Sequence, residues 1–401
     1  MGLRALPDDG RETGRHDLPG PGAGGRRELG RARRGPRGTV ARRWRAVPDR
    51  RGRVPAQIAR KGGGNVTVEE VSVDGFERVV IDRGPAGEAR SIIAVHDTRL
   101  GPALGGVRMR PYPNESDAVS ECLALARAMT VKAAAAGLDL GGGWSIIPAD
   151  TAEKTPERLL SHGRAIATFD GRFIPVNDVG TDQADLREIG KVTSPVCAQD
   201  DPSPWTALGV AAGIKACAEF SGRADLKGAR IGVQGAGHVG SALVRLLIRE
   251  GADVTVSDVD EDRAVSLAAE TGAMAVDPDT LPTSELDVFA PCALGGVVTP
   301  DVVPALRCRI IAGGANNVLA TPELADELRK RRIIYAPDFC VNSGGVIFLQ
   351  SQLRGLSEET ARDQVQGVGT TISELLAHAE TNRVTTSQAA NDLAQNRLDA
   401  A

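Results

Sequence analysis

Aromatic residues are scarce in this chain of 401 residues, and several other features are missing as well. Phe, Trp and Tyr together make up 3% of the sequence, too few for the aromatic stacking surfaces that bind single-stranded nucleic acids. No run of 18 consecutive apolar residues occurs, so we expect no membrane-spanning helix. The six cysteines are widely spaced and form no CxxC pair. This spacing favours reduced thiols in a cytoplasmic protein and argues against both a disulfide framework and a metal site.

The net charge of −4 hides an uneven distribution. Residues 1–65 carry 17 Lys and Arg against 6 Asp and Glu, whereas the rest of the chain carries 31 against 46. An acidic body has no electrostatic attraction to nucleic acids or anionic membranes, so we expect neither as a partner. Its ordinary globular composition and its length leave room for two domains.

Residues 1–65 are rich in Arg, Gly and Pro and lack apolar periodicity. Such a segment cannot bury enough apolar surface to offset its loss of conformational entropy, so we expect a disordered extension. Three interpretations stay open: a mis-assigned start with the native chain beginning at Val66, a passive tail, or a functional tail that binds nucleic acid or targets the protein.

Hydrophobic periodicity predicts the elements of the body. Residues 68–95 alternate apolar and polar positions between turns, which predicts two or three strands. The helix expected over residues 117–136 places Lys132 near its end. Further helices are expected at 156–169, 204–220 and, as the last helix packing back onto the first domain, around 358–382, with a short strand at 172–176.

The clearest local signal follows residues 230–234 (RIGVQ), which are typical of a buried strand. Next come Gly235, Ala236, Gly237, His238, Val239 and Gly240, then a helix over 241–249, a strand over 253–257 and Asp258. This order is that of a dinucleotide-binding unit. The first glycine makes the turn, the second lets the backbone approach the pyrophosphate, and the third allows close helix–strand packing. A carboxylate at Asp258 would bind the ribose hydroxyls and repel a 2′-phosphate, which favours NAD over NADP.

Strand-like runs continue at 287–290, 309–312 and 333–335 between helical stretches. This alternation predicts a doubly wound parallel sheet. We therefore expect an α/β protein with an N-terminal substrate and oligomerisation domain over 66–203, completed by C-terminal helices over 346–401. A Rossmann-type NAD-binding domain should span 204–345, and the active site should lie in a cleft between the two domains.

Several motifs in this order resemble the glutamate/leucine/phenylalanine/valine dehydrogenase family, with most similarity to the valine and leucine dehydrogenases. They are residues 101–109 (GPALGGVRM), 129–132 (MTVK), 141–143 (GGG), 177–181 (NDVGT), 202–206 (PSPWT), 290–296 (APCALGG), 315–317 (ANN) and 336–345 (APDFCVNSGG). The resemblance implies a homo-oligomer that catalyses reversible oxidative deamination, with NAD as cofactor and an amino acid, 2-oxo acid or imine as ligand.

The resemblance also implies roles for single residues. Lys132 matches the lysine that binds the α-carboxylate, and Asp178 matches the catalytic carboxylate. Residues that match the lining of the substrate site are Gly105, Gly106, Met129 and Asn342. Thr206 and Asn316 match residues near the nicotinamide. Leu104, Val176 and Val346 supply no cation for a distal carboxylate, so an apolar side chain is expected on the substrate.

One position departs from the family. The family places a catalytic lysine directly after the three glycines, and here that position holds Trp144. An indole accepts no proton, and losing a positioned base costs roughly 10²–10⁴-fold in rate. The indole also removes a positive charge that helps to keep Asp178 ionised, and Lys154 and Lys191 are no evident replacements.

Three hypotheses follow from Trp144. The first is an oxidoreductase of altered scope that acts on a preformed imine, whose reduction requires no activated water. The second is a weak valine- or leucine-type dehydrogenase. The third is a catalytically impaired homologue that binds NAD or an amino acid as a sensor or partner subunit.

Overall fold

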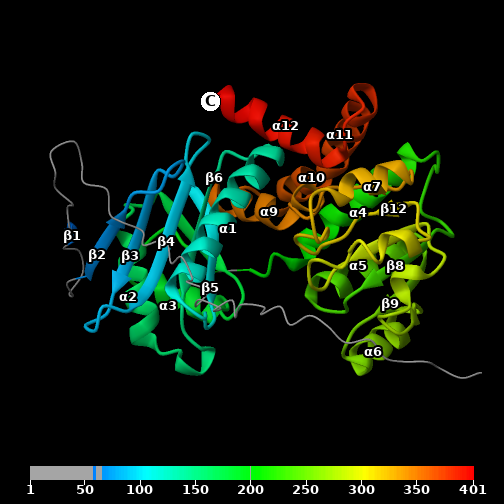
Figure 1. The fold of residues 1–401 in the computed structure, drawn as a ribbon. Helices are drawn as coiled ribbons and strands as arrows, with labels where there is room; N and C mark the ends of the chain where they lie inside the picture. Colours follow the sequence, from blue (N-terminus) through cyan, green and yellow to red (C-terminus); the bar gives the residue numbers. More distant parts are fainter. Residues whose placement is uncertain (1–56, 60–65, 199) are drawn as a thin grey trace, which may run out of the picture. The chain divides into compact units, whose positions relative to one another are not determined.

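Two β-sheets organise the chain. The computed structural model describes residues 57–59, 66–198 and 200–401, and the rest of the N-terminal extension lies outside these ranges. Within these residues, the first sheet has seven strands and the second has six. Figure 1 shows both sheets with the helices that pack on them. Two α/β units of this kind were expected from the sequence, and the expected fold class is confirmed.

The seven-stranded sheet carries the substrate half of the motifs. Its strands are β1 (Gln57–Ala59), β2 (Val66–Val71), β3 (Arg78–Arg83), β4 (Ala89–Asp97), β5 (Ala103–Met109), β6 (Gly141–Ile147) and β7 (Phe173–Asn177). Their order is β1-β2-β3-β4-β6-β5-β7. The pairs from β1 to β4 and the pair β4–β6 are antiparallel, whereas β5 runs parallel to both β6 and β7. Strands β5 and β6 were not predicted from the sequence, because their glycines carry little strand propensity.

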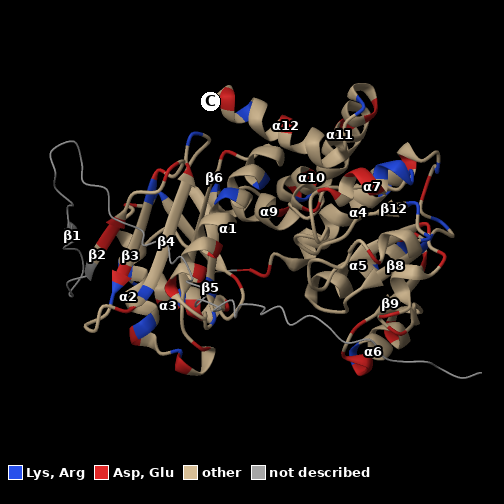
Figure 2. Ribbon diagram, in the orientation of Figure 1, with Lys and Arg blue, Asp and Glu red and all other residues tan. Residues whose placement is uncertain are grey.

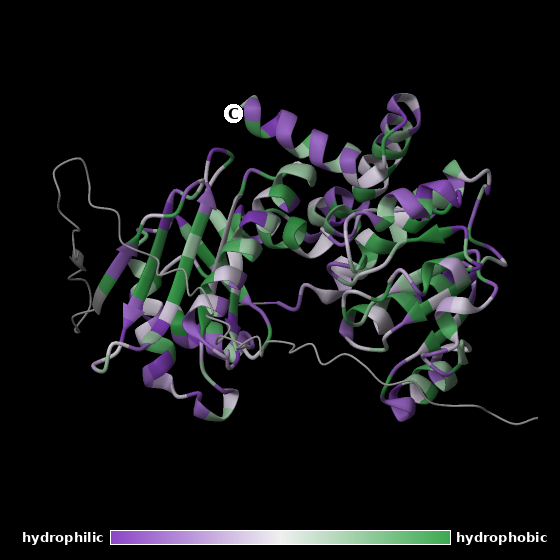
Figure 3. Ribbon diagram, in the orientation of Figure 1, coloured by the Kyte–Doolittle hydropathy of each residue, from purple (hydrophilic) through white to green (hydrophobic). Residues whose placement is uncertain are grey.

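Helices cover both faces of this sheet, and they are α1 (Glu115–Ala135), α2 (Pro156–Ala167) and α3 (Gln183–Ile189), with the short 3-10 turn η1 (Thr151–Glu153). Ile92 and Ala94 of β4 belong to the apolar cluster that includes α1, whereas Ile93 and Val95 belong to the cluster that includes α2 and α3. Alternate residues of a strand face opposite sides, so α1 packs on one face and α2 with α3 on the other. Accordingly, the central strands are largely apolar along their length (Figure 3).

The six-stranded sheet is parallel throughout and carries the glycine fingerprint. Its strands are β8 (Arg230–Gln234), β9 (Asp253–Ser257), β10 (Met274–Ala275), β11 (Val288–Pro291), β12 (Ile310–Ile311) and β13 (Ile334–Tyr335). The order β10-β9-β8-β11-β12-β13 is the 3-2-1-4-5-6 order of a Rossmann sheet. Between them lie α5 (His238–Arg249), α6 (Glu261–Thr271), α7 (Leu324–Lys330), η2 (Leu281–Thr283) and η3 (Val303–Ala305). The doubly wound parallel sheet predicted from the sequence is confirmed.

The remaining helices correct one prediction. They are α4 (Ser203–Phe220), α8 (Asp338–Val341), α9 (Gly344–Leu353), α10 (Glu358–Gln366), α11 (Val368–Asn382) and α12 (Thr386–Asp399). The single last helix expected around 358–382 is two helices, α10 and α11, which are separated at Gly367. The last helix is α12, and it returns to α1 and to the turn after β4: Arg397 donates to the carbonyl oxygen of Ala134, and Arg99 donates to that of Leu398.

Residues 57–59, within the segment 1–65 for which the sequence predicts a disordered extension, form strand β1, which pairs antiparallel with β2. The other residues of that segment lie outside the described ranges. Strand β2 is visibly acidic in Figure 2, and its Glu69 and Glu70 form ion pairs with Arg83 and Arg78 of β3. Among the described residues, no helix has the length and apolarity needed to cross a membrane.

Candidate functional site

The three glycines of β6 let helix α1 approach the sheet closely. A Cβ atom at Gly142 would lie 2.1 Å from the backbone nitrogen of Thr130 in α1, a distance that no side chain tolerates. The next strand residue on the same face is Trp144, because side chains alternate along a strand. Its side chain is 9% exposed, and its carbonyl oxygen lies 3.4 Å from the Cys122 sulfur of α1. The position at which the resemblance implies a lysine is therefore buried between α1 and the sheet.

The indole of Trp144 lies against Gly106 of β5 and close to Asp178. A Cβ atom built on Gly106 would lie 2.6 Å from Cζ2 of the indole and 2.9 Å from Cβ of Asp178. Only glycine leaves room for the ring at this point. The indole Nε1 is buried and has no hydrogen-bond partner in the described part of the chain. The structure thus brings together Gly106, Trp144 and Asp178, as the sequence predicted for one site.

Arg108 joins this group, although no sequence motif assigned it a role. Residues Val107 and Asn177 are partners in the parallel pair β5–β7. The residues that follow them, Arg108 and Asp178, therefore lie side by side. Nε of Arg108 donates to Oδ2 of Asp178 at 2.6 Å, and the guanidinium carbon lies 5.5 Å from the centre of the Trp144 ring. The signal was available, since Arg108 is the only charged residue in β5 and shares a face with Gly106, two residues earlier. Arg108 therefore places a positive charge directly beside Asp178.

Lys132 connects the first half of the site to the second. It lies in the last turn of α1, and its Nζ donates to Oδ1 of Asn316 at 3.4 Å. The side-chain amide of Asn342 donates to the same oxygen at 2.8 Å. Burial disfavours the ammonium and lowers the pKa of Lys132 to about 8, although the nearby carboxylate of Asp338 opposes this effect. Lys132, Asn316 and Asn342, all predicted for the site, therefore meet around one amide oxygen.

Asp338 is a second residue to which no sequence motif assigned a role. It begins helix α8, and its Oδ2 accepts from the backbone nitrogen of Val318 at 2.7 Å and from the Tyr335 hydroxyl at 3.3 Å. These bonds tie the loop after Asn316 to the helix that carries Asn342 at its end. The only sequence signal was its place inside the quoted segment 336–345.

The glycine loop after β8 has the geometry of a phosphate-binding turn. Gly235 has a φ of 105°, in the region that side chains avoid. A Cβ atom at Gly240 would lie 1.9 Å from the carbonyl oxygen of Gly235, so α5 packs tightly on the loop. A Cβ atom at Gly237 would meet no described atom within 4 Å. Gly237 also caps α5 without a side-chain hydrogen bond, which leaves amides of the first turn free for an anion. These features fit a dinucleotide.

Helix α5 begins at His238, three residues before the predicted start at 241, since Gly237 already acts as its cap. The side chain of His238 is 86% exposed, and Val239 lies beside Gly314. Asp258 follows β9, and its Oδ2 accepts from the backbone nitrogen of Ala236 at 2.7 Å. The acidic residue is therefore hydrogen-bonded to the glycine loop, where the ribose of a bound dinucleotide is expected.

The other predicted residues take the following places. Gly105 lies against the Gly143 carbonyl oxygen, Met129 is buried in α1 one turn before Lys132, and Thr206 in the first turn of α4 lies beside Gly345. Lys154 forms an ion pair with Asp185, and Lys191 forms one with Glu188. Neither lysine contacts the described site residues, so neither replaces the missing base.

The cysteines are free, as expected from their spacing. Burial raises the pKa of the Cys197, Cys217 and Cys292 thiols to about 12. A thiol with so high a pKa is protonated at neutral pH and is a poor nucleophile. None of these three is a candidate for covalent catalysis.

Comparison with known families agrees with this geometry. Residues 75–194 match the dimerisation domain of the Glu/Leu/Phe/Val dehydrogenases, and residues 260–401 match the Glutamate/Leucine/Phenylalanine/Valine dehydrogenase domain. The chain belongs to this family. In addition, residues 230–288 match a family described as NADP oxidoreductase, coenzyme F420-dependent, which covers the dinucleotide-binding unit.

Three relatives show how far the similarity extends. A leucine dehydrogenase of Geobacillus stearothermophilus is 39% identical over 333 residues, which cover 81% of this chain and 91% of that one. An L-tryptophan dehydrogenase of Nostoc punctiforme is 39% identical over 336 residues, covering 82% and 95%. A valine dehydrogenase of Streptomyces virginiae is 38% identical over 336 residues, covering 81% and 94%.

The solved structure of L-tryptophan dehydrogenase from Nostoc punctiforme is similar in fold as well. It aligns with a TM-score of 0.74 at 40% identity and covers 81% of this chain and 96% of that one. The chain is thus an oxidoreductase of the amino-acid dehydrogenase type, and the cofactor predicted from Asp258, NAD, agrees with the family and with the Rossmann sheet.

Proposed function

We propose that the chain is an NAD-dependent oxidoreductase that acts on the carbon–nitrogen bond of an apolar L-amino acid or of an imine derived from one. The observation that carries this proposal is the convergence of Lys132 and Asn342 on the side-chain oxygen of Asn316. It brings the ammonium of Lys132, in α1, to a loop of the dinucleotide-binding half, and this supports a role for Lys132 in holding an α-carboxylate. A substrate carboxylate held there would present its α-carbon close to the cofactor site.

The residues divide the work of the reaction. Lys132 holds the α-carboxylate, and Asp178 accepts a proton from the substrate amine. NAD, when bound through the glycine loop and Asp258, supplies hydride-transfer chemistry. Leu104, Val176 and Val346 are buried or half-buried and place no cation near the side chain of the substrate. An apolar side chain therefore fits better than an acidic one.

Trp144 shapes the choice between amino acid and imine. Deamination requires water to add to an iminium carbon, and the indole at this position cannot take a proton from that water. Reduction of a preformed imine needs no such step. The site should therefore turn over imines faster, relative to amino acids, than a lysine-containing relative does.

The test is an assay of the full chain and of Trp144→Lys with L-leucine, L-valine, L-phenylalanine and L-tryptophan plus NAD. A second assay uses NADH with a cyclic imine carboxylate. We expect weak or no deamination by the unaltered chain, imine reduction by the same chain, and faster deamination after Trp144→Lys. Inertness of both proteins in both directions, while NAD still binds, would refute the proposal and leave a binding protein without turnover.

We further propose that the enzyme is a homo-oligomer in the cytoplasm. Support for assembly comes from the matched segment 75–194, which is described as a dimerisation domain. The free cysteines suit a reducing compartment. Light scattering of the purified full chain tests the first point, since a mass equal to one chain would contradict it. Cell fractionation tests the second.

A further inference from the structure

We propose that Arg108 is the positioning residue of the substrate site: it holds its positive charge against the Asp178 carboxylate and leaves one carboxylate oxygen free, and the indole of Trp144 holds the guanidinium in place. The catalytic role that this inference gives to Arg108 rests on the proposed function. The electrostatic claim itself concerns only side chains of this chain, so it can be tested without any substrate.

The first support is the geometry of the guanidinium. Its Nε donates to Oδ2 of Asp178 at 2.6 Å, and its Nη1 donates to Oε1 of Glu121 in α1 at 2.5 Å. The side chain of Arg108 is 17% exposed. A planar, rigid guanidinium bound at two ends has little freedom to rotate. Arg108 therefore fixes the direction of the Asp178 carboxylate.

The second support is the oxygen that Arg108 leaves free. In the described part of the chain, Asp178 makes one side-chain ion pair, through Oδ2, and Oδ1 has no hydrogen-bond partner. Oδ1 is therefore the atom that can take a proton from a substrate amine: the N–H bond breaks and an O–H bond forms at Oδ1. Arg108 favours this role because it holds the carboxylate through Oδ2 and leaves Oδ1 available to the substrate.

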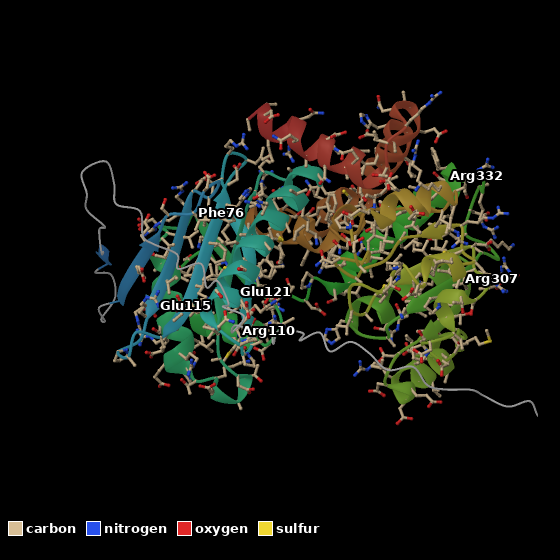
Figure 4. All side chains as sticks on the ribbon, in the orientation of Figure 1. Phe76, Arg110, Glu115, Glu121, Arg307 and Arg332 are labelled. Atoms are coloured by element: carbon tan, nitrogen blue, oxygen red, sulfur yellow. The ribbon has the colours of Figure 1, made fainter. Side chains whose placement is uncertain are left out.

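The third support is the charge balance around Arg108. Burial disfavours its charge, yet hydrogen bonds and attraction from Asp178 and Glu121 outweigh burial and raise the pKa of Arg108. Burial likewise disfavours ionised Glu121, but hydrogen bonds, among them those from Arg110 and Arg108, lower its pKa. Glu121 and Arg110 are labelled close together in Figure 4, and Nη2 of Arg110 donates to Oε2 of Glu121 at 2.7 Å. Two cations and two carboxylates thus form one cluster.

Trp144 completes the arrangement. Its ring lies 5.5 Å from the guanidinium carbon, within the range of a cation–π contact. The same ring packs on Gly106 beside Asp178. The indole at position 144 therefore restricts where Arg108 can move. Because the indole carries no charge, it does not compete with Arg108 for Asp178. A lysine at that position would bring a second cation to the same carboxylate.

The experiment uses Trp144 as its own reporter. The chain has three tryptophans, Trp44, Trp144 and Trp205, so the full chain with Trp44→Phe and Trp205→Phe fluoresces from Trp144 alone. Its emission is followed from pH 3 to pH 9 without substrate. We expect a transition as Asp178 gains a proton, and we expect Asp178→Asn to abolish it. That loss assigns the transition.

Variants in this background then test Arg108. Arg108→Gln should move the midpoint to higher pH by about one unit or more, because removing a neighbouring cation disfavours the carboxylate. Arg108→Lys should restore much of the original midpoint. The matched control is Arg110→Gln, which removes a partner of Glu121 but not of Asp178, and its midpoint should stay within about 0.3 units of the parent, a small fraction of a direct charge effect.

Glu121→Gln covers the case in which Arg108→Gln does not fold. It leaves Arg108 paired with Asp178 alone and removes a neighbouring negative charge, so the midpoint of the fluorescence transition should move to lower pH. Retained NAD binding shows that each variant is folded. Equal midpoints in the Arg108 and Arg110 variants would overturn the proposal, and so would an unchanged midpoint in Glu121→Gln. These fluorescence measurements do not depend on turnover. The proposed function is tested separately, by the amino-acid and imine assays.

Discussion

The two sheets of this protein relate to their sequences in different ways. In the parallel sheet, the residues of the site are neighbours in the chain: the glycine loop spans six positions, and Asp258 closes the same unit. In the mixed sheet, the site is assembled from β5, α1, β6 and the turn after β7. A local motif therefore describes the first site well, whereas the second depends on strand order and on contacts between distant segments.

This difference explains where an unusual residue can be accommodated. A side chain at Gly240, at the end of the glycine loop, would meet backbone at once, because a Cβ atom there would lie 1.9 Å from the Gly235 carbonyl oxygen. Trp144 instead fills space over Gly106 and beneath α1, and Arg108 supplies a charge from another strand. The substrate half can thus change its chemistry while the cofactor half keeps its geometry.

The largest effect should come from the carboxylate of the mixed sheet. Asp178→Asn removes the proton acceptor and should lower kcat by roughly 10²–10⁴-fold. Because the glycine loop is not involved, the NAD dissociation constant should stay the same. Steady-state kinetics and calorimetric titration with NAD measure the two quantities. A variant with full kcat would exclude Asp178 as the acceptor, and weakened NAD binding would break the separation of the two halves.

Two alanine substitutions in the glycine loop sharpen the same comparison. At Gly237 a methyl group meets no atom of the described residues within 4 Å, so Gly237→Ala should leave stability unchanged but weaken NAD binding roughly tenfold or more, by filling the space of the phosphates. At Gly240 it collides with the Gly235 carbonyl, so Gly240→Ala should lower the free energy of unfolding by about 1–3 kcal/mol. Urea unfolding and NAD titration distinguish them. Equal stability losses would contradict the prediction.

The pH dependence of substrate binding tests Lys132. Burial lowers its pKa to about 8, so the ammonium is present below that pH and is lost above it. In the free enzyme, KM for a carboxylate-bearing substrate should rise about tenfold for each pH unit above the pKa. KM measured from pH 7 to pH 10 shows the rise. Lys132→Met should have a high KM with no such dependence, and a flat KM in the unaltered chain would remove Lys132 from this role.

The smallest effect concerns the choice of cofactor. Asp258→Ser removes a carboxylate that would repel a 2′-phosphate, so the preference for NAD over NADP should fall by roughly tenfold, about 1.4 kcal/mol. The matched control is Asp260→Ser, because Asp260 caps α6 nearby and should not change the preference. The ratio of kcat/KM for the two cofactors is the measurement. An unchanged ratio in Asp258→Ser would show that selectivity arises elsewhere.

Much of the cofactor half could be predicted from sequence, for a physical reason. Strand, turn, helix and acidic residue follow each other without interruption, and each glycine has a local backbone role. The start of α5 was misplaced by three residues, since Gly237 rather than Gly240 is its cap. The break at Gly367 was also missed, because apolar periodicity continues across it.

In the substrate half, sequence identified residues but not their partners. Trp144, Asp178 and Lys132 were found from their motifs, whereas Arg108, Glu121 and Asp338 were not. The glycines of β5 and β6 concealed both strands, and the pairing β5–β7 that brings Arg108 to Asp178 joins residues 70 positions apart. No periodicity reports such a pairing.

The sequence by itself determined the family, the Rossmann unit with its preference for NAD, and the absence of a lysine after Gly143, because each of these depends on the order of nearby residues. The tertiary structure alone decided which side chains surround Asp178. Strand order and the tight packing of α1 on β6 bring a guanidinium, an indole and a carboxylate together at one point. Electrostatic interactions of this kind depend on distance in space and not along the chain.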